Sequence, residues 1–379
     1  MNSSEIGILI SIITYLSFMI AIGFYCRKNN DTADDFYLGG RRLGPFVTAM
    51  SAEASDMSSW LLMGLPGVAY LTGAADAAWT AIGLAIGTYV NWLIVAKRLR
   101  CYTHVNRSIT IPDFFSNRYH DNRKVLMFIA AVVIIIFFIP YTASGFSACG
   151  KLFHTVFGID YFTATVISAA VIIVYTTMGG FLAASTTDFV QGIIMSIALL
   201  IVLGFGIHAA GGIDAVAANA SALPGYLSLN HSYDAATNTA SAYGPITVVS
   251  TMAWGLGYFG MPHILLRFMA IEDKEKLKLS RRVATTWVVI SLAVAVAIGI
   301  IGYGASVAGA LPMLEDPETV IVKIANLVST YGILFALLAG VILSGILAST
   351  MSTVSSQLLA ASSSVSENVL KGKIGRAHV

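Results

Sequence analysis

Nine apolar stretches dominate the sequence and limit what the chain can fold into. A helix needs ~20 consecutive apolar residues to cross the hydrocarbon layer of a bilayer, and each stretch reaches that length. Only 11% of the residues are charged, against ~25% in a soluble domain. We therefore expect an all-α membrane protein and not a soluble multidomain protein. The predicted membrane segments are 5–26, 44–71, 76–97, 125–148, 160–180, 188–210, 245–266, 284–308 and 330–367.

The positions of lysine and arginine predict how these segments are oriented. Cytoplasmic loops of membrane proteins carry an excess of both residues. With the N-terminus outside, 20 of the 22 fall in cytoplasmic loops, among them Arg267, and only Lys151 and Lys323 fall outside. The polar stretch 211–244 contains neither residue, as is typical of an external loop. We expect a multi-pass protein with its N-terminus outside.

Signatures of enzymes and of cofactor-binding proteins are missing from the sequence. The three cysteines are far apart and predict neither a disulfide framework nor a zinc site. Residues 255–260 match the dinucleotide-binding pattern GxGxxG, but they lie in an apolar run and no strand precedes them. No nucleophile–histidine pairing or phosphate loop is visible. We expect no enzymatic activity, no organic cofactor, no nucleic-acid partner and no obligate protein partner.

The second segment carries two carboxylates, Glu53 and Asp56, at membrane depth. A charged group there costs several kcal/mol, so it is a candidate functional residue. Small and hydroxyl residues surround both, and such a run competes with helical hydrogen bonding. We predict a helix bent or unwound between Ala54 and Ser59, whose freed carbonyls can bind Na⁺. The alternative is that Asp56 only caps a half-helix and that Glu53 faces water.

The seventh segment contains a second interruption, at residues 254–262. Three glycines and Pro262 break the apolar run, and Trp254 and Tyr258 stand four residues apart. We expect an unwound helix whose aromatic rings shape a pocket for a small solute. The alternative is that these rings only pack between helices, with glycine allowing close approach.

The ninth segment has hydroxyl residues along one helical face. The residues are Ser349, Ser352, Thr353 and Ser356. Their neutral oxygens can bind a hard cation such as Na⁺, or they can hydrogen-bond between helices, and the sequence favours neither.

Asp188 lies at the predicted cytoplasmic start of the sixth segment. A carboxylate in the first turn of a helix is stabilised by the helix dipole. A role in ion release toward the cytoplasm is the functional alternative.

Four motifs in this chain resemble the sodium:solute symporter family. They are DDFYLGGRRLGPF at 34–46, SDMSSWLLMGLPG at 55–67, WGLGYFGMPHILLR at 254–267 and SGILASTMSTVSSQLL at 344–359. The resemblance covers nearly all of residues 5–370 and is strongest to the proline-transporting bacterial members. It implies Na⁺-coupled symport of L-proline across the bacterial cytoplasmic membrane by alternating access, with the lipid bilayer as its surroundings. The alternatives are another small solute (another amino acid, a monocarboxylate, a sugar or pantothenate) and a non-transporting membrane fragment or sensor.

The resemblance also implies a LeuT-type core of two inverted repeats behind one extra N-terminal helix. About nine membrane helices are then present, where the family has about thirteen. The implied parts are the extra helix at 5–26, a five-helix first repeat at 44–210, an extracellular loop at 211–244, three helices of a second repeat at 245–368, and a cytoplasmic end at 369–379 that has the look of a truncation scar.

The family's functional residues are carried over onto matching positions. The implied Na⁺ ligands are the carbonyls of Ala54, Met57 and Ser349 and the hydroxyls of Ser352 and Thr353. The remaining implied roles are ion coupling by Asp56, Ser58 and Asp188, substrate binding by Tyr141, Trp254, Tyr258 and Pro262, and a cytoplasmic-side position for Arg41. The departures that bear on substrate identity are Glu53, where glycine is expected, and Met261, where a polar residue is expected.

Overall fold

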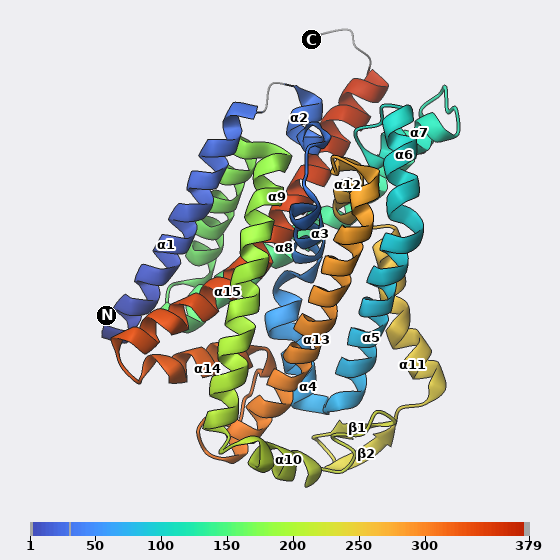
Figure 1. Cartoon of the computed structure of the whole chain (residues 1–379). Helices are drawn as coiled ribbons and strands as arrows, with labels where there is room; N and C mark the ends of the chain where they lie inside the picture. The colour runs from blue at the N-terminus through green and yellow to red at the C-terminus, as the bar shows by residue number, and fades with distance from the viewer. Residues whose placement is uncertain (1–2, 30–31, 375–379) are drawn as a thin grey trace.

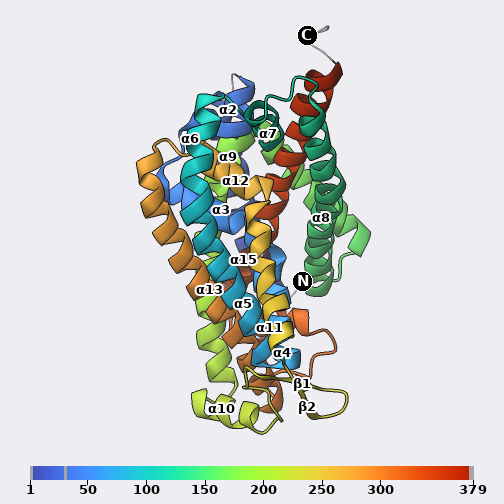
Figure 2. The ribbon, with the colours of Figure 1, turned by 90° about the vertical axis from the view of Figure 1, so that its right-hand side faces the viewer.

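Long apolar helices form most of the structure, as the composition predicts. The computed structural model describes residues 3–29 and 32–374, and in this part six helices are long and apolar enough to cross a membrane. They run side by side in Figures 1 and 2. Their ranges are Ser3–Cys26, Ala74–Val105, Val125–Phe157, Tyr161–Ala209, Lys274–Val307 and Ile333–Lys371. Of the predicted cytoplasmic end at 369–379, residues 369–374 are helical, and 375–379 lie outside the described residues.

The individual elements follow the predicted segments closely. The long helices are α1 (Ser3–Cys26), α5 (Ala74–Asn91), α8 (Val125–Phe157), α9 (Tyr161–Ala209), α13 (Leu277–Val307) and α15 (Ile333–Ser363). A π-helical turn (Trp92–Ala96) continues α5 into α6 (Lys97–Val105), and another (Ser364–Ile374) continues α15. The short helix α14 (Val320–Ser329) precedes α15.

The second and seventh segments are too short to count among those six because each is broken. The second consists of α3 (Pro45–Ser59), a π-helical turn (Trp60–Gly64) and α4 (Leu65–Thr72). The seventh consists of α11 (Pro245–Met252), a 3₁₀ helix (Ala253–Phe259) and α12 (Pro262–Ala270). Both interruptions were predicted, and both are confirmed.

The fifth and sixth predicted segments are merged in α9. The 49-residue helix is interrupted only at Gly180, whose φ of 58° and ψ of −152° are accessible to glycine. The predicted connection at 181–187 is therefore wrong, because these residues are helical. Because residues 181–187 are helical, Asp188 lies within the helix and not at its start.

Short elements gather at the two ends of the long helices (Figure 1). At one end lie α2 (Ala33–Leu38), α6 and α7 (Ile111–Arg118). At the other end lie α10 (Ile213–Ser221) and an antiparallel hairpin of β1 (His231–Asp234) and β2 (Thr239–Ala242), in which His231 pairs with Ala242. The hairpin falls in the polar stretch 211–244, where no strand was predicted.

Helix α5 packs backbone to backbone against the broken seventh segment. A Cβ atom built on Gly83 would lie 2.5 Å from the Cα of Met252, and one on Gly87 would overlap the carbonyl of Gly255. Only glycine permits this approach. The contact holds the 3₁₀ helix beside α5.

Candidate ion and substrate site

The break in the second segment is centred on Ser58. This residue has φ 47° and ψ −170°, a conformation outside the helical region, and its hydroxyl accepts a hydrogen bond from the Trp60 N–H at 3.2 Å. The Trp60 N–H also faces the Met57 carbonyl. The predicted bend between Ala54 and Ser59 is confirmed at this position.

The hydroxyl face of α15 lies directly against the break. Ser352 Oγ donates to the Ala54 carbonyl at 2.7 Å and lies 3.1 Å from the Ser349 carbonyl. Thr353 Oγ1 lies 3.2 Å from that same carbonyl. Four of the five predicted ligand residues are therefore in mutual contact and buried. The fifth, Met57, lies one turn along α3.

This set of oxygens suits a small hard cation. All the oxygens are neutral carbonyls or hydroxyls, which are the donors that fit Na⁺ at a broken helix. In the described part of the chain, no group of three or more His, Cys, Asp or Glu residues could hold a metal ion. The donor chemistry thus favours an alkali cation over a transition metal.

A cavity lies next to the break, and Met57, one of the predicted ion ligands, also lines it. About 60 Å³ of it is open to the centres of water-sized molecules. The lining residues are Asp56, Met57, Ser58, Trp60, Leu84, Tyr141, Trp254, Gly257, Tyr258 and Met261.

The cavity brings together residues that the sequence analysis placed in two different sites. Of the predicted substrate residues, Tyr141, Trp254 and Tyr258 line it, while Pro262 does not and instead starts α12. Of the predicted ion-coupling residues, Asp56 and Ser58 line it. Asp56 therefore faces the cavity, although a merely capping role had been the alternative.

Aromatic rings form much of the cavity wall. The Trp254 ring lies 4.9 Å from the Trp60 ring at an interplanar angle of 60°. Tyr258 is buried beside the Asp56 carboxylate, whereas Trp254 is 52% exposed. The rings provide apolar surface, and Asp56 is the one charged residue in the described lining.

Three lining residues were missed by the sequence analysis. Trp60, Leu84 and Gly257 carry no polar signal that distinguishes them from residues that pack or face lipid. His263 was missed as well. Its Nε2 lies 3.9 Å from Asp56 Oδ1, and both ring nitrogens are buried without a hydrogen-bond partner in the described structure.

Glu53 does not face water, so the alternative offered for it is wrong. The side chain is buried, and the Trp92 Nε1–H donates to its Oε1 at 2.7 Å. The Trp92 ring in turn packs against Phe268 with centroids 4.4 Å apart. Glu53 therefore connects α3 to the helix formed by α5 and α6.

Asp188 is not in the first turn of a helix, and Arg267 is not in a cytoplasmic loop. Asp188 lies eight residues beyond Gly180 and is fully buried, as is Arg267. Arg267 donates to Asp188 Oδ2 at 2.9 Å, and Ser51 donates to the same oxygen at 2.7 Å. Arg267 also donates to Ser51 at 2.9 Å and to Ser356 at 2.5 Å. One buried ion pair thus joins α3, α9, α12 and α15.

Arg41 is remote from the cavity and connects short elements at one end of the molecule. Its guanidinium donates to the carbonyls of Ser108 at 2.7 Å, Met269 at 2.9 Å and Thr103 at 3.0 Å. Burial lowers the pKa of this guanidinium. Its contacts position α6, α7 and the end of α12 relative to one another.

Comparison with known proteins supports the resemblance seen in the motifs. The model of the sodium:solute symporter family matches residues 36–378. The chain belongs to the sodium:solute symporter family. It is accordingly a transporter and not an enzyme.

Curated relatives of this symporter chain are named as proline transporters. Sodium/proline symporter 2 of Staphylococcus saprophyticus is 43% identical over 364 residues, which are 96% of this chain and 68% of that protein. The high-affinity proline transporter of Bacillus subtilis is 42% identical over 361 residues, which are 95% of this chain and 73% of that protein.

A solved structure shares the fold. It is the substrate-bound outward-open state of a Na⁺-coupled sialic acid symporter, with a TM-score of 0.80 and 20% identity over 98% of this chain and 76% of that chain. The predicted fold class, an all-α membrane protein of LeuT type, is confirmed by this match.

Proposed function

We propose that this symporter couples the entry of Na⁺ to the entry of L-proline. The observation that carries the proposal is the sharing of one break by two sites. Residues 54–58 contribute the Ala54 carbonyl to the oxygen set on α15 and the Asp56 and Ser58 side chains to the cavity wall. A cation bound at the oxygen set would therefore change the positions of the Asp56 and Ser58 side chains in the cavity wall, and a solute in the cavity would change the position of the Ala54 carbonyl.

The cation side of the proposed site is made by backbone and hydroxyl oxygens. The proposed ligands are the carbonyls of Ala54, Met57 and Ser349 and the hydroxyls of Ser352 and Thr353. Bound Na⁺ would join α3 to α15 and so fix the conformation of the break. Asp188 would assist from one turn away, since its partners Ser51 and Ser356 lie on the same two helices.

The solute side of the proposed site suits a small zwitterion with an apolar body. The pyrrolidine ring of proline would pack on Trp254, Tyr258 and Tyr141. Its amine would lie toward Asp56, and its carboxylate would accept hydrogen bonds from N–H groups freed at the 3₁₀ helix. The names of the curated relatives support proline as the solute.

Coupling follows from linkage between the two sites. If Na⁺ tightens proline binding, proline must tighten Na⁺ binding by the same factor. A rocking motion of the two repeats, proposed at 44–210 and 245–368, then exposes both ligands to the other side. The membrane potential contributes ~2.3 kcal/mol per charge per 100 mV to this step.

The proposed orientation places the N-terminus and the stretch 211–244 outside a bacterial cytoplasmic membrane. In this orientation α10 and the hairpin are extracellular, and α2, α6 and α7 are cytoplasmic. The excess of lysine and arginine at the α2, α6 and α7 end supports it.

Uptake by the purified chain in proteoliposomes tests the proposal. An inward Na⁺ gradient should stimulate uptake of radiolabelled L-proline, and an inward K⁺ gradient should not. Stimulated uptake of another amino acid, a monocarboxylate, a sugar or pantothenate, without uptake of proline, would reject proline as the solute. Absence of both uptake and Na⁺-dependent proline binding would reject the transporter function for this chain.

A further inference from the structure

A groove between α5 and α13 lies outside the proposed transport site. It is lined by four residues of α5, from Ala78 to Ala85, and four of α13, from Val289 to Val296. All eight are aliphatic, and several are alanines, which leaves the seam between the two helices open. On a chain that spans a membrane, this surface faces acyl chains.

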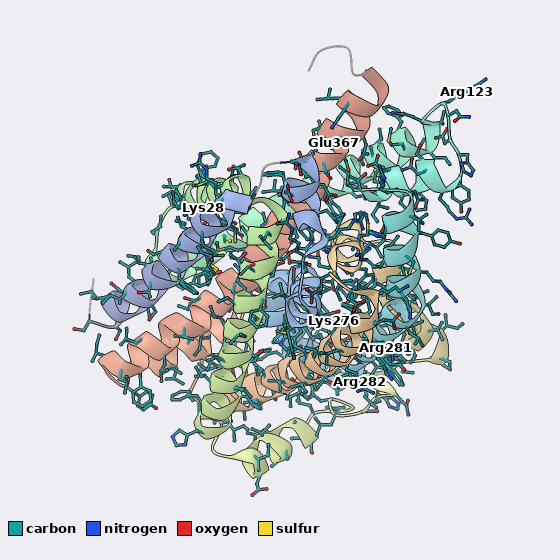
Figure 3. The ribbon with its side chains drawn as sticks, turned by 45° about the horizontal axis from the view of Figure 1, so that its top comes forward. Lys28, Arg123, Lys276, Arg281, Arg282 and Glu367 are labelled. Carbon is teal, nitrogen blue, oxygen red and sulfur yellow. The ribbon has the colours of Figure 1, made fainter. Side chains whose placement is uncertain are left out.

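A basic cluster continues the groove along the same face of α13. Lys278, Arg281 and Arg282 precede Val289 and Val296 at helical spacing, so that all five lie on one stripe. Figure 3 shows Arg281 and Arg282 next to each other on α13, with Lys276 nearby. At 1.5 Å per residue, Arg281 lies ~12 Å from Val289 and ~22 Å from Val296 along the helix axis.

The basic cluster lies at the end of the groove, and its side chains form no ion pairs in the described structure. The Arg281 guanidinium lies 5.3 Å from the centre of the Tyr89 ring, which is on α5 just beyond the groove. In the described structure, no carboxylate pairs with Lys278, Arg281 or Arg282. The neighbouring lysines differ, because Lys276 binds Glu272 at 2.6 Å and Lys97 binds Glu275 at 2.9 Å.

We propose that the α5–α13 groove and this cluster bind an anionic phospholipid. The phosphate would lie between Arg281 and Arg282, and one acyl chain would lie along the groove. Charge complementarity supports the head group, because unpaired basic residues at a membrane boundary attract anionic lipid. The spacing supports the chain, because the near end of the groove lies ~12 Å from the arginines along the helix axis, so that the distal part of an acyl chain crossing a half-bilayer of ~15 Å reaches it.

Bound lipid would be detected by native mass spectrometry of the purified chain with added dioleoyl phosphatidylglycerol or dioleoyl phosphatidylcholine. The wild-type chain should retain phosphatidylglycerol preferentially. We expect each arginine to contribute about fivefold to this retention, so Arg281→Gln with Arg282→Gln should lower it about 25-fold. The matched control, Lys97→Gln with Lys276→Gln, removes two paired charges from the same end and should retain the lipid.

A second variant separates a built site from general surface attraction. Ala293→Phe fills the groove while leaving every charge in place, and it faces lipid, so the fold tolerates it. This variant should also lose phosphatidylglycerol, by at least fivefold. Equal retention of the two lipids by the wild-type chain, or wild-type retention in the arginine variant, would overturn the proposal. Wild-type retention in Ala293→Phe would overturn the acyl-chain site.

Discussion

The two broken segments differ in chemistry and in burial. In the first, α3 buries nine of its fifteen residues, and the break is a single residue, Ser58, opposite buried hydroxyls. In the second, α11 buries none of its residues although α12 buries all of its own, and the break is a seven-residue 3₁₀ helix with Trp254 and Leu256 exposed. A short break surrounded by buried residues suits an ion of one fixed size, whereas a longer, partly exposed break lined by aromatic rings suits a larger organic solute.

The largest expected effect comes from cutting the contact that joins the two broken segments. Arg267→Ala removes the guanidinium that connects α12 to Ser51 of α3 and leaves Asp188 buried without its partner. Loss of one member of a buried pair typically costs ~3–5 kcal/mol. We expect a strong loss of stability, measured by thermal unfolding in detergent.

The matching control removes both charges. Arg267→Ala combined with Asp188→Ala should recover part of the lost stability, because no uncompensated charge remains. A double variant less stable than Arg267→Ala would show that the pair is not the source of the effect.

The next largest effect belongs to the seventh segment. Tyr258→Ala should weaken apparent proline affinity at least tenfold, since loss of a buried aromatic side chain costs ~3–5 kcal/mol in a core, and Trp254→Ala should weaken it less, because Trp254 is half exposed. The Na⁺ concentration for half-maximal uptake should change much less. Uptake at varied proline and varied Na⁺ measures both, with lipid-facing Phe137→Ala as the control. Wild-type proline affinity in both variants would mean that the rings only pack between helices.

The hydroxyls of α15 that face the break in the second segment should show the reverse pattern. Ser352→Ala or Thr353→Ala removes one proposed oxygen ligand, which is worth about 1–1.5 kcal/mol, or roughly five- to tenfold in affinity. The Na⁺ concentration for half-maximal uptake should rise by that factor, and proline affinity at saturating Na⁺ should stay within twofold. An unchanged Na⁺ dependence in both variants would remove the ion site from α15.

The smallest effect separates a carbonyl ligand from a hydroxyl ligand. Ser349 Oγ donates to the Ile346 carbonyl within its own helix at 2.9 Å, and only the Ser349 carbonyl faces Ser352 and Thr353. Ser349→Ala should therefore change the Na⁺ dependence less than twofold. A tenfold change, measured in the same uptake assay, would show that its hydroxyl takes part.

Both breaks could be predicted because the cause of each is local. Serine beside Asp56, and glycine before Pro262, disfavour a continuous helix whatever surrounds them. The contact between Ser352 and Ala54 followed from the helical spacing of hydroxyls on one face and from the resemblance to the family.

The buried ion pair could not be predicted in the same way. Asp188 and Arg267 are 79 residues apart, and each alone is ordinary, as a helix-start carboxylate and as a loop arginine. The prediction that Arg267 is cytoplasmic came from the excess of lysine and arginine in cytoplasmic loops. That rule does not consider whether an arginine has an ion-pair partner in another helix. Trp60 and Leu84 were missed for a related reason, since an apolar side chain at membrane depth looks the same whether it faces lipid or a cavity.

The backbone contact between α5 and the second broken segment has a mechanical consequence. Where Gly83 and Gly87 meet Met252 and Gly255, no side chain can change rotamer to absorb a displacement. If the 3₁₀ helix moves outward, α5 must therefore move with it, or the backbone contact between them must separate completely. One added methyl group at Gly87 would overlap the backbone of Gly255 and force the two elements apart. At Gly83 and Gly87 the contact has room for the hydrogen atom of glycine and not for a methyl group, and any movement of the two elements relative to each other depends on this fit.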